Sequence, residues 1–415
     1  MATPARQVPF AWPALTLDSS GVELRFAAPS SLAKDTPANL RITLALEQST
    51  CSVVIVETLA PTATPRTELA RFDLRYGCVF QIFSTPLSPS AAAHIAREPV
   101  RLRLLSGPPI TIFTAAVATT PSDFPPEFSP HLLAAAPPAP PEAVLPRLAT
   151  LACLQPFNWL HGCVVDALAD AGDHAALSAH LGRWFHADGH LRYLGPHSEP
   201  RLDELFGLEP VLMFAALARH DPCHPAWKVL RRWLAKHTES DGLIIDRGLD
   251  AEGLASAVTY ISIEAAYTVA YPLALAATAL NEPSWRDLAV HQIRHRLAHL
   301  VRDGVVCQRA PLGGPGEQPH WARANAWFLL GLVKTLRALG DHDFVPEGIA
   351  LLRTHAARIL AAQRPDGLWS VYLDDPAASP PPPSRPCAPC GATGSTSPSC
   401  SRRCSSSPPS TPARE

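Results

Sequence analysis

The sequence predicts a mainly α-helical protein: an (α/α)6-type toroid, a ring of helical hairpins, that is apparently truncated and follows an N-terminal β-sandwich. Three observations support this prediction. Residues 1–120 alternate apolar and polar side chains in short runs, 121–147 are rich in proline and alanine, and 148–375 carry amphipathic helical patterns with a repeated Asp-Gly signal. A chain of 415 residues is long enough for two such domains.

The N-terminal zone, residues 1–120, has the pattern of a small antiparallel sandwich. Period-two alternation marks the runs 22–26, 40–44 and 71–74, and β-branched residues dominate two further runs, 51–56 and 110–113. Proline, serine and glycine clusters separate these runs, as turns do between short strands. The following segment, 121–147, is expected to be a linker.

The second zone, residues 148–375, shows apolar side chains at helical spacing and an internal repeat. Asp-Gly follows the second helix of each pair, with its glycine at Gly189, Gly242, Gly304 and Gly367, at intervals of about 50 to 60 residues. The zone is short and its loops are long and polar, which favours closure into a ring over an open solenoid. The expected helices span 156–171, 174–187, 202–219, 224–238, 260–280, 284–301, 320–339 and 345–363.

The last zone, residues 376–415, holds 11 prolines and 10 serines and has no hydrophobic periodicity. Such a segment cannot bury a core, so we expect it to be disordered. Its four cysteines, Cys387, Cys390, Cys400 and Cys404, fit either a zinc site or a shifted reading frame in a GC-rich gene. The second interpretation is favoured because no folded scaffold is expected around these thiols.

Bulk composition narrows the function classes. A net charge of −2 gives no electrostatic case for nucleic acid or an acidic membrane as a partner. We find no secretory signal and no uninterrupted apolar stretch of about 18 residues, so no transmembrane helix is expected. Singly spaced cysteines indicate reduced thiols and a cytoplasmic location: Cys51, Cys78, Cys153, Cys163, Cys223 and Cys307.

The segment 320–327 carries the most specific chemistry. On a helix His320, Arg323 and Trp327 share one face, because they are three and seven residues apart. A guanidinium can bind a carboxylate with two hydrogen bonds and an indole can stack on a sugar, so this face suits an acidic sugar. The alternative is an arginine that bonds a neighbouring loop beside a core tryptophan.

Residues 321–327, Trp-Ala-Arg-Ala-Asn-Ala-Trp, resemble the Trp-Ala-Arg-Gly-Asn-Gly-Trp signature of the unsaturated glucuronyl and unsaturated rhamnogalacturonyl hydrolases, glycoside hydrolase families 88 and 105. Other segments resemble these families in the same order along the chain. The resemblance covers about 151–378, and its further segments are 158–162, 201–207, 264–276, 281–293 and 363–369.

The resemblance implies a toroid of six inner and six outer helices. It also implies an oligosaccharide substrate that a polysaccharide lyase has left with a 4,5-unsaturated uronic acid at its non-reducing end. These enzymes hydrate the double bond: an acid protonates C4, water adds at C5, and the resulting hemiketal opens and releases the sugar. No metal or organic cofactor is implied. The acid needs a pKa raised by burial or by a like-charged neighbour.

By position, Glu264 falls on the family's acid/base aspartate and Asp203 on its second carboxylate. Arg323 and Trp327 match the substrate-binding arginine and tryptophan, and Gln308 stands where the family has a histidine. His320 and two residues of the opening motif, Trp159 and His161, complete the expected binding residues. For Glu264 and Asp203 the alternative is an ordinary helix carboxylate, favoured at Asp203 by the helix dipole.

Several features depart from the family pattern. The expected acid is a glutamate, one methylene longer than aspartate, and both signature glycines are alanines, Ala324 and Ala326. The family's last two helix pairs would follow Trp369, where the Pro/Ser-rich segment stands, so eight helices are expected instead of twelve. Tyr267 and Tyr271 either line the lumen or pack against the next helix.

Three alternatives remain open from the sequence. The chain is an active hydrolase or a catalytically impaired relative that binds sugar without turnover. A sugar epimerase of the toroid class would need paired histidines on inner helices, and we find none. A histidine stripe at His291, His295 and His299 fits a metal site or, as we favour, a solvated helix face.

Overall fold

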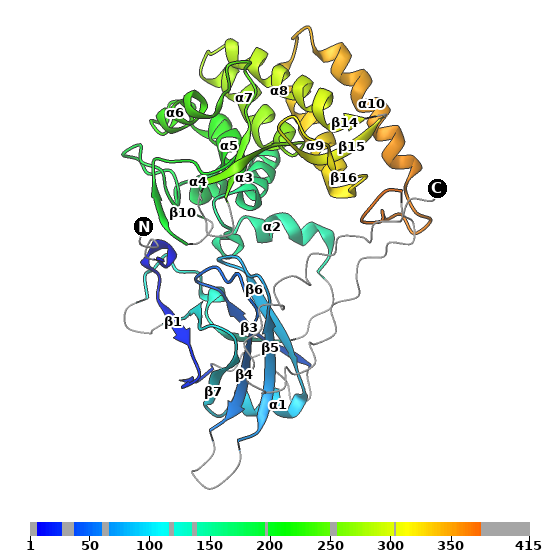
Figure 1. The fold of residues 1–415 in the computed structure, drawn as a ribbon. Coiled ribbons are helices and arrows are strands. Elements are labelled where there is room, and N and C mark those ends of the chain that lie inside the picture. The colour runs from blue at the N-terminus through cyan, green and yellow to red at the C-terminus, as the bar shows by residue number, and fades with distance from the viewer. Residues whose placement is uncertain are drawn as a thin grey trace. The chain divides into compact units, whose positions relative to one another are not determined.

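Two antiparallel sheets enclose one apolar core in the N-terminal part of the chain. The computed structural model describes residues 6–26, 37–59, 66–115, 120–134, 139–195, 198–249, 255–302 and 304–374. The expected Pro/Ser-rich zone with its four cysteines lies outside these residues. Figure 1 shows the strands of this part gathered together with the short helix α1, Pro89–Ile95.

The first sheet has the order β2-β7-β4-β5 and the second has the order β6-β3-β9. A separate pair, β1 and β8, is connected to β3 through a bridge between Leu44 and Ile112. The segment 121–147, expected as a linker, contributes β9 to the second sheet. The strands are β1 Ala14–Leu17, β2 Val22–Leu24, β3 Ala38–Thr43, β4 Ser52–Thr58, β5 Glu68–Leu74, β6 Ile82–Leu87, β7 Val100–Ser106, β8 Ile110–Phe113 and β9 His131–Ala134.

Alternate side chains of these strands fill the space between the sheets. Phe72 and Leu74 of β5 are buried, whereas Arg71 and Asp73 between and beside them are exposed. The buried residues join side chains of the second sheet, such as Leu40, in one apolar cluster. This period-two burial is what the sequence pattern predicts for a sandwich.

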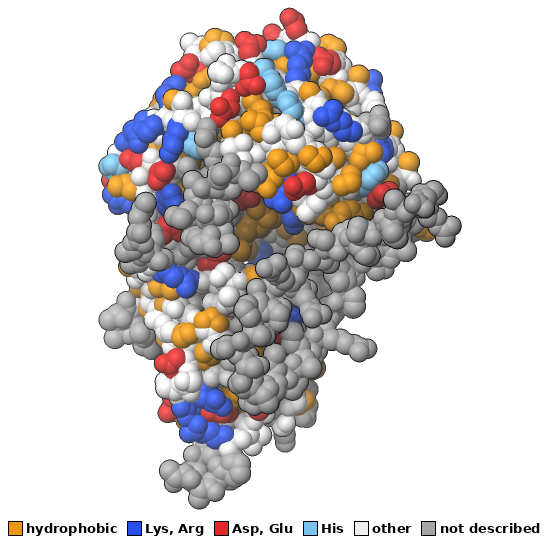
Figure 2. Space-filling view, in the orientation of Figure 1, with side chains coloured by type: hydrophobic (Ala, Val, Ile, Leu, Met, Phe, Trp, Pro, Cys, Tyr) orange, Lys and Arg blue, Asp and Glu red, His pale blue; other side chains and the backbone are white. Residues whose placement is uncertain are grey.

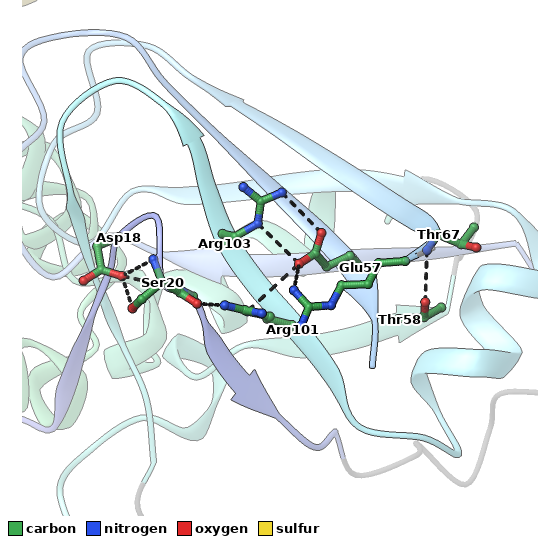
Figure 3. A network of polar contacts seen from close by, with 9 residues as sticks. Asp18, Ser20, Glu57, Thr58, Thr67, Arg101 and Arg103 are labelled. Atoms are coloured by element: carbon green, nitrogen blue, oxygen red, sulfur yellow. Dashed lines mark hydrogen bonds and ion pairs between the residues drawn. The ribbon is translucent and has the colours of Figure 1, made fainter. Parts of the chain in front are cut away.

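A buried carboxylate binds arginines across the first sheet (Figure 3). Glu57 of β4 accepts hydrogen bonds from Arg66 at 3.2 Å and from Arg103 of β7 at 3.3 Å. Arg101 lies 4.0 Å from the same carboxylate and donates a hydrogen bond to the carbonyl of Ser20. Burial acts to raise the pKa of Glu57, but the hydrogen bonds and charges of Arg103 and Arg66 outweigh it and hold the pKa below its usual value.

Four helices follow one another at the centre of the C-terminal part, and we call them the inner helices (Figure 1). Each packs on the next in the series α3, α5, α7 and α9. They are α3 Trp159–Ala171, α5 Met213–His220, α7 Tyr271–Ala279 and α9 Ala322–Leu339. The intervening helices are α4 His174–Leu181, α6 Trp227–His237, α8 Ser284–Leu300 and α10 Val345–Ala361, and the short α2 covers Val144–Leu148. Among the described residues, no helix is both long and apolar enough to cross a membrane.

All eight expected helices are present, but the sequence pattern overextends three of them. Residues 202–208, 260–264 and 182–187 are not α-helical. The first follows the hairpin of β10 Arg192–Leu194 and β11 Pro200–Leu202, and the second begins within β13 Ala255–Ser262. β13 pairs with β12 Asp246–Leu249 and β15 Val305–Pro311, and two short strands, β14 Val301–Arg302 and β16 Glu317–Pro319, complete this sheet. The prediction that residues 148–375 are purely helical was therefore wrong. Pairing with a distant strand outweighs the helical spacing of a short stretch of apolar residues.

One carboxylate, Asp166 of α3, contacts the other three inner helices. It is 2% exposed and accepts hydrogen bonds from Arg219 of α5 and Lys334 of α9. It also accepts hydrogen bonds from two tyrosines, Tyr267 just before α7 and Tyr271 at the start of α7. Burial and the charge of Asp166 raise the pKa of both tyrosines, so they remain donors. The two tyrosines thus face this carboxylate at the centre of the inner helices.

We expect Asp166→Ala to destabilise the protein by about 3–5 kcal/mol, because two partly buried cations and two buried tyrosine hydroxyl groups lose their buried acceptor. The matched control is Asp170→Ala on the same helix. Asp170 also pairs with Arg219 and Lys334, but its side chain is 53% exposed, so its loss should cost below about 1 kcal/mol. Urea unfolding of both variants tests this, and equal losses would contradict the central role of Asp166.

Candidate active site

Glu264 lies where a strand turns into an inner helix. It follows β13 and precedes a π-helical turn, Ala266–Ala270, that leads into α7. The carbonyl of Glu264 accepts hydrogen bonds from the backbone of Tyr267 and Thr268 at 2.9 and 3.0 Å. Single π-helical turns are rare and frequent at functional sites. The turn holds the Glu264 side chain at the N-terminal end of the inner helices.

Close backbone packing fixes this turn. Gly331 of α9 lies against it so tightly that a Cβ at this position would be 2.4 Å from the carbonyl carbon of Ala266. Only glycine allows that approach. Helix α9, which carries Arg323 and Trp327, is thereby held directly against the turn that carries Glu264.

The Glu264 carboxyl group is partly buried among polar side chains. Its Oε1 lies 3.4 Å from Nε2 of Gln308 on β15, and the backbone of Ile263 donates to the Gln308 carbonyl at 2.9 Å. Burial raises the pKa of Glu264 above its usual value and the charge of Asp246 adds to this effect, while Arg323 and the hydrogen bond from Gln308 oppose it. The group therefore holds its proton to higher pH than a free glutamate.

Two carboxylates near Glu264, Glu209 and Asp246, were not expected from the sequence. Glu209 starts the 3-10 turn Glu209–Leu212 before α5, and Asp246 starts β12. Both line a cavity of about 340 Å³. Glu209 is accessible within this cavity, yet protein surrounds it, and this enclosure with the charges of Glu264 and Asp246 raises its pKa to about 7. Both residues lie outside the segments that resemble the hydrolase families.

Two inner helices carry the expected aromatic residues and Arg323: Trp159 begins α3, and Arg323 and Trp327 lie in the first turns of α9. Trp327 packs edge-on against Trp159 of α3, with ring centroids 5.2 Å apart, and stacks on Tyr267 at 5.4 Å. Arg323 is exposed and lies 4.2 Å above the ring of Trp321. Its guanidinium group donates no hydrogen bond to a described residue. The structure thus brings Glu264, Gln308 and Arg323 together, and places Trp327 with Trp159.

Three expected residues lie in other surroundings. His161 is fully buried, stacks on His180 of α4 at 5.2 Å, and has a pKa well below its usual value because of burial and of His180. Asp203 accepts hydrogen bonds from His190 at 2.8 Å and from the backbone of Leu191 at 2.9 Å. His320 lies 3.5 Å from Asp374. These contacts join His161, Asp203 and His320 to their own loops and helices.

The histidine stripe lies on α8, where Figure 2 shows pale blue side chains at the surface. His291 contacts the carbonyl of Asp241 at 2.6 Å, and His299 contacts that of His295 at 2.8 Å. Within the described part of the chain, no three His, Cys, Asp or Glu side chains are arranged so that they could hold a metal ion. The stripe therefore carries no argument for a metal site.

The pKa of Glu209 predicts a pH-dependent penalty on stability. Because its pKa rises from 4.5 to about 7 on folding, the folded protein favours the protonated form. The stability of the folded protein with protonated Glu209 is fully retained below about pH 4.5, and it is lost as the pH rises through about 7, where the penalty becomes complete. We expect Glu209→Gln to be more stable than the unchanged protein above about pH 7 and equally stable near about pH 4.5. Urea unfolding across this range tests it, and a difference that does not vary with pH would contradict it.

The part of the chain that carries most of the candidate site matches a known protein family. Residues 263–388 match the model of Glycosyl Hydrolase Family 88, a segment that includes Glu264, Gln308, Arg323 and Trp327. No curated protein matches the chain.

Similar solved structures include a glycoside hydrolase of family 105 from C. acetobutylicum, at 16% identity and a TM-score of 0.44, with 53% of this chain and 64% of that chain covered. A possible family 105 member from Klebsiella pneumoniae has 21% identity and a TM-score of 0.41, with 53% and 59% covered. An unsaturated glucuronyl hydrolase from Bacillus sp. GL1 has 16% identity and a TM-score of 0.39, with 52% and 66% covered. The chain spans less than two thirds of the length of each of these structures. Residues 263–388 are thus similar in sequence to Glycosyl Hydrolase Family 88, which confirms the resemblance that the motifs indicate.

Proposed function

We propose that this protein is a glycoside hydrolase that acts on unsaturated uronyl oligosaccharides by hydrating their 4,5 double bond. The observation that carries the proposal is Glu264, a partly buried carboxyl group of raised pKa that lies near Arg323 within the segment matching the hydrolase family. A carboxyl group whose pKa is raised above its usual value is better suited to give a proton to an enol ether than an ordinary glutamate is.

In the proposed reaction, protonated Glu264 gives its proton to C4, which leaves positive charge at C5 and the ring oxygen. A water molecule then forms a bond to C5 and returns one proton to the Glu264 carboxylate. The product is a hemiketal at C5. Its opening breaks the bond between C5 and the ring oxygen and leaves a hemiacetal at C1, which collapses to an aldehyde and releases the next sugar with a free hydroxyl group. The net change is addition of water, and Glu264 ends protonated as it began.

Arg323 is the proposed partner of the uronate carboxylate, because its guanidinium is exposed and no described residue hydrogen-bonds to it. Trp327, Trp159 and Gln308 are the proposed neighbours of the sugar ring. Asp203, His161 and His320 stay predictions from the family resemblance, and their contacts with His190, His180 and Asp374 favour supporting roles.

The four inner helices and their partners are, in this proposal, four hairpins of a six-hairpin toroid. The oligosaccharide is the proposed partner, and no cofactor enters the reaction. The six cysteines among the described residues are free thiols, which supports the proposed cytoplasmic location.

One observation favours an alternative, a sugar-binding relative without turnover. The amide of Gln308 donates a hydrogen bond to Glu264, and such a bond stabilises the charged carboxylate and so makes the proton less available to a substrate. Binding of an unsaturated oligosaccharide without loss of its double bond would single out this alternative.

We expect Glu264→Gln to lower the rate of double-bond loss by about 10²–10⁴-fold, the usual contribution of a general acid. Glu264→Asp, which restores the family's residue, is the matched control and should retain far more activity. The measurement is ultraviolet absorbance of the conjugated uronate, with disaccharides made by lyases from rhamnogalacturonan and from glycosaminoglycans. A folded protein that leaves the absorbance unchanged on every substrate would refute hydrolysis by this chain.

We expect Arg323→Lys to raise KM about tenfold with a smaller change in kcat, because lysine cannot bind a carboxylate with two parallel hydrogen bonds. Arg337→Lys, an exposed position at the other end of the same helix, is the control and should leave both constants unchanged. Equal KM values for Arg323→Lys and the unchanged protein would exclude Arg323 as the uronate partner.

A further inference from the structure

A buried cation on α8, Arg296, lies outside the candidate site but is connected to it. Its side chain is 0% exposed, and its hydrogen bonds to described residues all go to carbonyl or amide oxygen atoms, none to a carboxylate. Burial lowers the pKa of Arg296 to about 9, and the charge of Asp246 opposes this effect. A buried charge without a paired carboxylate costs stability, so an apolar side chain would fill this space at least as well.

The guanidinium group of Arg296 connects three segments. Its Nε donates a hydrogen bond to the carbonyl of Ser262, and its Nη2 donates one to the carbonyl of Ile244, both at 2.9 Å. Its Nη1 donates to Oε1 of Gln292 at 2.9 Å and to the Gln292 carbonyl at 3.1 Å. One side chain thus joins α8 to the end of β13 and to the loop before β12.

The two segments that Arg296 holds lead directly to two acidic residues of the site. Ser262 ends β13 and lies two residues before Glu264. Ile244 lies two residues before Asp246, the first residue of β12. Two residues of chain span at most about 7 Å, so a shift of either carbonyl moves the residue that bears the carboxyl group.

The peptide unit between Ser262 and Ile263 is hydrogen-bonded at both ends. Its carbonyl accepts from Arg296, and its N–H donates to the carbonyl of Gln308 at 2.9 Å. Because a peptide unit is planar, these two hydrogen bonds orient the plane from which the chain continues to Glu264. Arg296 thus supplies one of the two contacts that set this orientation.

Gln292, one turn before Arg296 on α8, holds the second segment as well. Its Oε1 accepts a hydrogen bond from the backbone of Ile244 at 2.9 Å, and its Nε2 donates to the carbonyl of Gly242 at 2.7 Å. Ile244 is therefore bound through its N–H to Gln292 and through its carbonyl to Arg296. These two buried side chains give the loop before Asp246 a defined position.

We propose that Arg296 is a positioning residue, which fixes the backbone segments that carry Glu264 and Asp246 relative to each other and so keeps their two carboxyl groups at a set separation. The inference rests on the proposed function for the role of Glu264 as the proton donor. Arg296 does not touch the substrate itself, because its side chain is fully buried.

The charge of Arg296 adds a second effect. It favours the charged form of Asp246, and the charge of Asp246 in turn raises the pKa of Glu264. The other charged groups that interact with Glu264 come from three further elements: Glu209 before α5, Arg309 of β15 and Arg323 of α9. Loss of Arg296 leaves these three in place and weakens the charge of Asp246, so the pKa of Glu264 should fall.

Two variants of the full chain separate position from charge. Arg296→Lys keeps the buried charge but loses the planar group that reaches three carbonyls. We expect it to lower kcat about tenfold or more with little change in KM, because the acid is displaced while Arg323 still binds the uronate. Arg296→Met also removes the charge. Both variants should lower the pKa of Glu264 toward the value of about 4.3 of a free glutamate, Arg296→Met the more.

The pKa is measured without substrate, by NMR titration of ¹³C-labelled glutamate carboxyl groups, with Glu264→Gln to assign the signal. The rate constants come from the absorbance of the conjugated uronate. Arg294→Met, at an exposed position of the same helix, is the control and should change neither quantity. A purely structural role of Arg296 would lower the free energy of unfolding but leave the kcat and the Glu264 pKa of the folded fraction unchanged.

The inference and the proposed function can fail separately. If the unchanged protein removes the double bond, an unchanged kcat or an unchanged pKa of Glu264 in folded Arg296→Lys would overturn the inference alone. If the unchanged protein leaves the double bond intact, the proposed function fails and the titration decides: a lower pKa of Glu264 supports the positioning role, and an equal pKa overturns it. Arg296→Lys carries either decision if Arg296→Met does not fold.

Discussion

The buried carboxylate of Asp166 is the constraint on which the helical part of the protein depends. A carboxylate taken out of water is costly unless several donors satisfy it. Here the donors come from three other inner helices: Arg219 of α5, Tyr267 and Tyr271 at α7, and Lys334 of α9. Because all four donors must reach the same carboxylate, their hydrogen bonds restrict how the four helices can be spaced. The hydrogen bonds and ion pairs of Asp166 thus define the packing of the inner helices more narrowly than apolar contacts alone would.

That arrangement brings the N-terminal ends of the inner helices to the same region. Glu264 begins the turn before α7, Glu209 begins the turn before α5, and Arg323 lies in the first turn of α9. The partial positive charge at a helix N-terminus favours carboxylates, yet burial and mutual repulsion raise the pKa of Glu209 and Glu264. The close contact of Gly331 with Ala266 transmits the position of α9 directly to the turn of Glu264. The carboxyl groups at these helix ends therefore cost stability when they are charged. The hydrogen bonds to Asp166 stabilise the same four helices.

The sandwich and the helical part share an apolar cluster, so the N-terminal part is more than an appendage. Its aromatic side chains, Trp12, Phe80, Phe113 and Phe128, pack among one another. Trp184 of the helical part joins them through Phe80. A wall that is fixed in this way shapes the cavity between the two parts without a moving loop.

The sequence by itself determined the elements that depend on local periodicity. The strands around 40–44 and 71–74, the eight helices and the motif at 321–327 follow from spacing that neighbouring residues set. Tertiary structure alone decided the hairpin of β12 and β13, because β13 pairs with β15 further along the chain, for example Tyr260 with Pro311. It also decided which polar groups surround Glu264. Glu209 and Asp246 are unremarkable in sequence, and His161, which fits a binding motif, is buried against His180. The burial of His161 and the closeness of the carboxylates to one another arise only when distant segments fold together, so the local sequence pattern cannot predict them.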